Sequence, residues 1–79
     1  MTNQEKYDQC FIDSFNAHED QLKGLEYQSS PLWDSMGHMQ LISALEEQFD
    51  IMMETDDIVD LSSYKRGMSI LAEKYDVQF

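Results

Sequence analysis

Asp34 and Ser35 are the residues in this chain whose types and position best suit chemistry. They stand directly before apolar residues that recur three or four positions apart, at Met39, Ile42, Leu45 and Phe49. Asp and Ser are both preferred N-cap residues, so the sequence predicts a helix that begins at Asp34 or Ser35. Free backbone N–H groups and the helix dipole favour negative charge at that end. The Ser35 hydroxyl is therefore well placed to carry an anionic group.

The stretch resembles the acyl carrier protein family, whose signature is Asp-Ser-Leu-x-x-x-x-Leu at the head of the second helix. The corresponding residues here are Asp34-Ser35-Met36-Gly37-His38-Met39-Gln40-Leu41, followed by Ala44-Leu45-Glu46-Glu47-Gln48-Phe49-Asp50-Ile51. The resemblance implies that Ser35 carries a phosphopantetheine arm through a phosphodiester bond, with Asp34 supporting the attachment site. It also implies a carrier and not an enzyme, which holds an acyl or aminoacyl group as a thioester on that arm.

The pathway is indicated by departures from the family's housekeeping members. Fatty-acid-synthesis carriers commonly have acids where this chain has Gly37 and Gln40. Met36-Gly37 with Gln40-Leu41 resembles D-alanyl carrier proteins, and Trp33-Asp34-Ser35 with Gly37-His38 resembles freestanding carriers of specialised biosynthetic clusters. The expected partners are a phosphopantetheinyl transferase and the enzymes that load and transfer the group, in fatty-acid-like or specialised biosynthesis.

An ordinary helix cap is the alternative explanation of Asp34-Ser35. The chain would then be a small acidic protein-interaction module in which Ser35 is only an N-cap. Neither residue has the Glu or Gln three positions later that completes a capping box, because Gly37 and His38 stand there. Gly37 weakens the first turn and would let a modifying enzyme approach the serine. His38 falls near the apolar face, and no acid is evident to orient it as a catalytic partner of Ser35.

Length and charge restrict the function further. The chain has 79 residues, a net charge of −11 and one cysteine, Cys10. We expect a single domain over residues 1–79, a monomer, too small for both a deep enzyme cleft and a sizeable core. A lone cysteine on an apolar stripe predicts a buried thiol, no disulfide and a cytoplasmic setting. No stretch is long and apolar enough to span a membrane, and the charge excludes nucleic acid as a partner.

Acidic residues are concentrated around the candidate site. Residues 34–62 hold eight acids and no Lys or Arg, which predicts a docking surface for basic partners. The residues expected on this surface are Met36, Gln40, Ser43, Glu46, Glu47, Asp56 and Asp57. In the family the acyl chain can enter between the second and third helices. The matching positions, which could equally be ordinary core, are Met39, Ile42, Leu45, Ile58, Leu61 and Met68. The acidic residues lack the spacing of a calcium loop, so no metal site is expected.

The apolar periodicity predicts an all-α protein. Helices are expected at 3–18, 35–49, about 55–60 and 64–75, with Tyr7, Phe11 and Phe15 forming a core stripe on the first. Residues 19–33 are expected to form a long connection, in which Pro31 disfavours helix at Ser30 and a packed Trp33 fixes the approach to Ser35. Residues 77–79 are expected to fray. Three main helices and one short helix make a small antiparallel bundle, whose specific topology comes from the resemblance.

Overall fold

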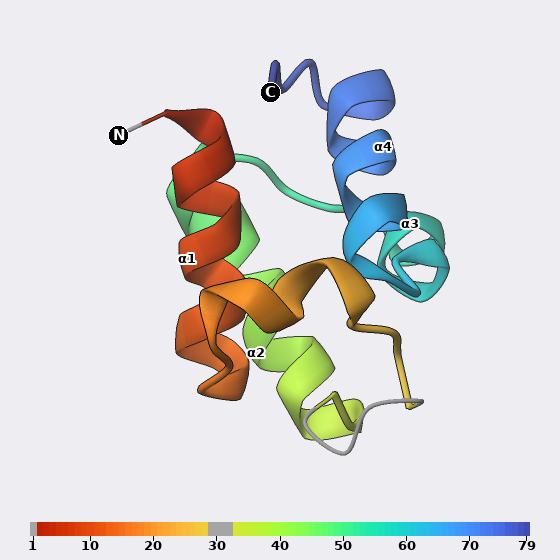
Figure 1. Ribbon diagram of the computed structural model, residues 1–79. Coiled ribbons are helices and arrows are strands. Elements are labelled where there is room, and N and C mark those ends of the chain that lie inside the picture. Colours follow the sequence, from red (N-terminus) through yellow and green to blue (C-terminus); the bar gives the residue numbers. More distant parts are fainter. Residues whose placement is uncertain (1, 29–32) are drawn as a thin grey trace.

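Helices make up most of residues 2–28 and 33–79, the part of the chain that the computed structural model describes (Figure 1). In chain order they are α1 (Asn3–Phe15), the 3₁₀ helix η1 (Glu19–Gly24), α2 (Ser35–Phe49), α3 (Thr55–Asp60) and α4 (Tyr64–Lys74). The expected all-α bundle is confirmed, and no β-strand occurs within these ranges. None of the helices in the described ranges is long and apolar enough to cross a membrane.

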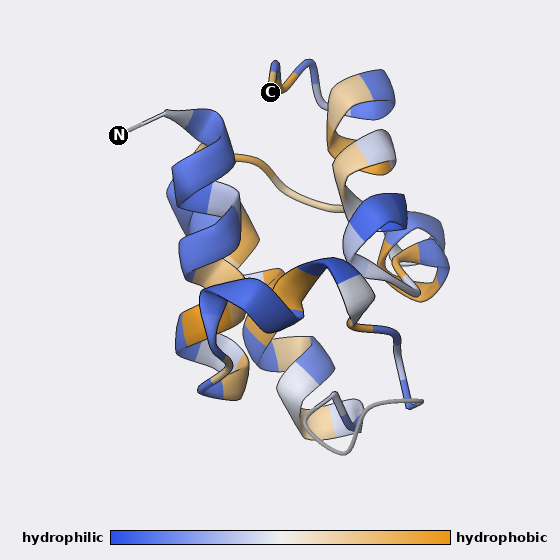
Figure 2. Cartoon of the chain, viewed as in Figure 1, coloured by the Kyte–Doolittle hydropathy of each residue, from blue (hydrophilic) through white to orange (hydrophobic). Residues whose placement is uncertain are grey.

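An aromatic cluster forms the centre of the core, where α1 packs against α2. Phe11 lies 5.4 Å from Trp33 and 5.3 Å from Tyr64 between ring centroids, and Phe15 lies 5.3 Å from Trp33. Trp33 and Tyr7 have no exposed surface. The predicted stripe on α1 and the predicted packing of Trp33 are therefore confirmed. Hydrophilic residues cover the outward face of α1 and much of η1 (Figure 2).

The connection between α1 and α2 is more ordered than the sequence predicts. Helix α1 ends at Phe15 and not at residue 18, because Asn16 adopts a left-handed conformation with φ of 52°. Residues 19–24 then form η1, which packs across α1 and α4 (Figure 1). The expectations for Ser30 and Pro31 lie outside the described residues.

A short antiparallel contact ties the end of this connection to the start of α4. The Tyr27 N–H donates to the Ser62 carbonyl at 2.9 Å, and the Tyr64 N–H donates to the Leu25 carbonyl at 3.1 Å. These bonds flank an isolated bridge between Glu26 and Ser63. Residues 25–27 are thereby held against the start of α4.

The sequence predicts that residues 77–79 fray, but in the structure these residues are packed against the helices. Val77 is buried, and its N–H donates to the Leu71 carbonyl at 3.0 Å. The Phe79 ring lies 5.3 Å from Tyr7, and the Asn3 side-chain amide donates to the Gln78 carbonyl at 2.9 Å. The C-terminal residues therefore pack against the first half of α1.

Candidate functional site

At the start of α2 the residue that caps the helix and the exposed serine are two different residues. Asp34 is the N-cap, and its Oδ1 accepts a hydrogen bond from the Gly37 N–H at 2.8 Å. Ser35 is the first helical residue, and its side chain is exposed. Asp34 therefore supplies the cap, and the alternative in which Ser35 is only an N-cap is wrong on this point. Ser35 keeps its hydroxyl free of the capping role.

Gly37 has an internal role that the sequence analysis missed. The residue is buried, and a Cβ atom placed on it would lie 2.7 Å from Phe15 Cε1. Glycine is thus required where α2 passes over the Phe15 ring of α1. The expectation that Gly37 leaves room for a modifying enzyme is not needed to explain this residue.

A small groove opens beside Ser35. Its volume is about 330 Å³, and its lining is mostly apolar. The lining residues come from the α1–α2 connection, α2 and α3, and they are Tyr27, Ser35, His38, Met39, Ile58 and Val59. The Tyr27 hydroxyl lies 3.1 Å from Ser35 Oγ, within hydrogen-bond distance. The serine therefore stands at the edge of a groove that could accommodate part of an attached group.

His38 links Trp33, which precedes α2, to α3 through two hydrogen bonds. The Trp33 indole N–H donates to His38 Nδ1 at 2.9 Å, and His38 Nε2 lies 2.7 Å from the Ile58 carbonyl oxygen. An indole N–H can only donate and a carbonyl can only accept, so Nδ1 is the acceptor and Nε2 carries the proton. His38 is buried, as the sequence predicts. Both ring nitrogens are occupied, so His38 has no lone pair to offer Ser35 as a general base.

Most of the expected docking residues lie on the surface. Met36, Gln40, Ser43, Glu47 and Asp56 are all exposed, and Met36 has 76% of its surface accessible. These five side chains, two acidic, two polar and one apolar, lie along α2 and at the start of α3. They are available to a partner.

Two expected docking residues act inside the fold instead. Asp57 is only 2% exposed, and its carboxylate accepts hydrogen bonds from Lys74 Nζ at 2.7 Å and the Tyr75 hydroxyl at 2.6 Å. These contacts join α3 to the end of α4, so Asp57 does not belong to the docking surface. The Lys74 hydrogen bond, followed by that of Tyr75, lowers the pKa of Asp57 below its ordinary value. Glu46 is half-buried, and its Oε2 accepts from the Met53 N–H at 2.9 Å.

The six expected acyl-pocket residues do not line one cavity. Met39 and Ile58 line the groove beside Ser35. Ile42, Leu45 and Leu61 are buried core residues. Met68 lies elsewhere, on α4. The structure therefore brings two of the six to the serine, and the ordinary-core explanation holds for three.

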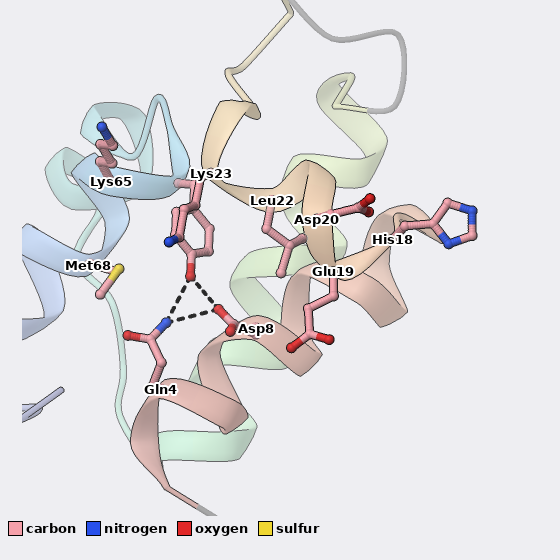
Figure 3. A pocket seen from close by; sticks show the side chains of 10 residues that line it. Gln4, Asp8, His18, Glu19, Asp20, Leu22, Lys23, Lys65 and Met68 are labelled. Atoms are coloured by element: carbon pink, nitrogen blue, oxygen red, sulfur yellow. Dashed lines mark hydrogen bonds between the residues drawn. The ribbon is translucent and has the colours of Figure 1, made fainter.

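A larger groove of about 1330 Å³ lies between α1, η1 and α4, and both polar and apolar groups line it (Figure 3). At its centre the Tyr64 hydroxyl donates to Asp8, and the Gln4 side-chain amide donates to both groups. Burial and the Asp8 hydrogen bond raise the pKa of Tyr64. Met68 is the one expected pocket residue in this lining. The hydrogen bonds account for the central polar groups as a link between α1 and α4.

Comparisons with known proteins add no assignment. No family model matches the chain, and no curated protein or solved structure gives a significant match. The described residues form a small helical bundle with an exposed serine at the head of α2. In the described ranges, His, Cys, Asp and Glu side chains form no group of three that could hold a metal ion.

Tyr27 and Val59 are the site residues that sequence reasoning missed. Tyr27 lies eight positions before Ser35, across a connection with no periodicity to place it. Val59 is exposed on α3, and its position in the groove depends on how α3 meets α2. No local sequence signal identifies either residue.

Proposed function

We propose that the protein is an acyl or aminoacyl carrier with a phosphopantetheine arm on Ser35. The observation that carries the proposal is the division of roles at the head of α2. Asp34 caps the helix, while the Ser35 hydroxyl is exposed beside an apolar groove. The likeness of the sequence around Ser35 to acyl carrier proteins supports the same assignment.

The attachment step requires a second protein. Ser35 Oγ would attack the pantetheine-side phosphorus of coenzyme A, forming an O–P bond as the pyrophosphate bond breaks and 3′,5′-ADP leaves. The proton of Oγ needs a base, and His38 cannot serve because its two nitrogens are occupied by Trp33 and Ile58. We therefore assign the base to the phosphopantetheinyl transferase. The thiol of the arm then holds the cargo as a thioester, and the chemistry is left to the arm and the partners.

The partners are proposed to have basic docking surfaces. Glu47 on α2 and Asp56 on α3 are exposed acids, and Met36 is an exposed apolar side chain on α2, which suits a partner that offers both basic and apolar contacts. A flexible methionine can adapt to several such surfaces in turn. We propose that the carrier acts in the cytoplasm, in specialised or fatty-acid-like biosynthesis, on the basis of the sequence likeness and the lone cysteine, Cys10.

Incubation with coenzyme A and a broad-specificity phosphopantetheinyl transferase tests the proposal. The intact mass should rise by one phosphopantetheine group, and Ser35→Ala should abolish the increase. Ser43→Ala is the matched control, because Ser43 is also an exposed serine of α2. Ser35→Ala should keep the circular dichroism of the wild type, since Asp34 still caps the helix. No mass increase of the wild type would leave the acidic interaction module as the better explanation.

A further inference from the structure

Tyr27 is held at the edge of the groove beside Ser35 by a backbone hydrogen bond and by ring contacts. Its backbone N–H is bonded to the Ser62 carbonyl next to α4. Its ring meets His38 edge-on at 4.8 Å and Trp33 edge-on at 6.3 Å between centroids. Trp33 and His38 are themselves buried and hydrogen-bonded to each other. The phenol hydroxyl is therefore a fixed group, presented from one direction to the side chain of Ser35.

We propose that Tyr27 is a positioning residue for the phosphopantetheine arm, donating a hydrogen bond to the phosphate carried on Ser35. The inference rests on the carrier function proposed above. In the unmodified protein the two hydroxyls lie 3.1 Å apart, and either can donate. Attachment removes the proton of Ser35 Oγ, so Tyr27 becomes the only possible donor of the pair.

Attachment also supplies a better acceptor than the serine. The non-bridging phosphate oxygens carry the negative charge, and hydrogen bonds to charged acceptors are shorter and stronger than neutral ones. These oxygens lie one bond beyond the phosphorus that is joined to Oγ. A phenol already in contact with Oγ can therefore reach one of them without moving its backbone. The contact would restrict the first bonds of the arm.

The position of Tyr27 also gives the arm a direction. Its ring forms one wall of the groove, and Met39, Ile58 and Val59 contribute apolar surface. A phosphate held by Tyr27 would start the arm along this groove and away from the acidic exposed face of α2. Tyr27 would act on the orientation of the arm, while the transferase would still perform the chemistry of attachment.

Phosphorus NMR of the modified protein tests the role of Tyr27. Tyr27→Phe keeps the ring that packs on His38 and Trp33 and removes the hydroxyl alone. We expect the variant to be modified and to show a displaced and narrower ³¹P resonance, because the phosphate loses a donor and gains mobility. Tyr75→Phe is the control, since its hydroxyl is bonded to Asp57 at the end of α4. That variant should keep the wild-type ³¹P resonance.

Proton cross-relaxation in the modified wild type gives a second test that needs no variant. Ring protons of Tyr27 should show contacts with the pantetheine methylene group that is bonded to the phosphate through oxygen. A modified protein without these contacts, or a Tyr27→Phe resonance identical to the wild type, would overturn the positioning role and leave the carrier function intact. No mass increase in the wild type would overturn the carrier function and this inference with it.

Discussion

Replacement of Gly37 by alanine tests the packing that positions the candidate site. Alanine favours a helix interior by about 1 kcal/mol over glycine, so propensity alone predicts stabilisation. The new Cβ would lie 2.7 Å from Phe15 Cε1 and 3.1 Å from Phe15 Cδ1. The ring has little room to retreat, because it is 5% exposed and packed on Trp33. Overpacking of a core costs about 1–3 kcal/mol, and weakening of the Asp34 cap adds up to about 1 kcal/mol.

The expected net effect of Gly37→Ala is destabilisation by about 1–2 kcal/mol, which in a domain of this size lowers the melting temperature by about 5–15 °C. Thermal melts followed by circular dichroism measure it. Gly24→Ala is the matched control, because nothing lies within 4 Å of a Cβ at that position. That change should be neutral or stabilise by up to about 1 kcal/mol. Equal melting temperatures for the two variants would refute the argument that α2 is held against Phe15.

Three further predictions concern charge and the thiol. The hydrogen bond from Lys74 lowers the pKa of Asp57 below its ordinary value of 3.8, so the stability that Asp57 contributes is present above about pH 4 and lost as pH falls through its folded pKa. Melts from pH 7 to pH 3 should therefore show a weaker acid dependence for Asp57→Asn than for the wild type; equal slopes would contradict this. Burial, with a smaller effect of Asp13, raises the pKa of Cys10 to about 11. A thiol reagent at pH 8 should accordingly find no fast-reacting thiol before phosphopantetheinylation and one after it, and a fast thiol in the unmodified protein would refute the burial of Cys10. Glu47→Lys should lower the kcat/KM of modification about 3–10-fold through slower association, as added salt should, while Glu73→Lys on α4 should change it less; equal effects would argue against docking on α2.

The helices were predictable because their apolar periodicity is strong. The bounds of α2 agree with the sequence prediction at both ends, since good N-cap residues precede Ser35 and the periodicity ends at Phe49. The bounds of α3 also agree and α4 ends one residue earlier than predicted, but α1 ends three residues earlier than predicted. Asn16 stops α1 by adopting a left-handed conformation, which the periodicity gives no reason to expect. The 3₁₀ helix η1 contacts α1 and α4, and its segment has no apolar periodicity from which a helix could be predicted.

The exposed position of Ser35 at the head of α2 was predictable from the sequence, and the surroundings of this residue were less so. Ser35 could be selected from its place before the apolar run. Asp57 was misplaced on the docking surface because its partners, Lys74 and Tyr75, come from another helix. The contact of Tyr27 with Ser35 likewise depends on how the connection folds against α4. The positions of Asp57 and Tyr27 depend on partners that are distant in the sequence, and apolar periodicity does not identify those partners.

The measurement that tests the carrier assignment most directly is the position of the modified residue after treatment with coenzyme A and the transferase. Trypsin should release residues 24–65 as one peptide, because no Lys or Arg lies between Lys23 and Lys65. Fragmentation of that peptide should locate one phosphopantetheine group on Ser35. An unmodified peptide, or a group on another of its serines, would contradict the account.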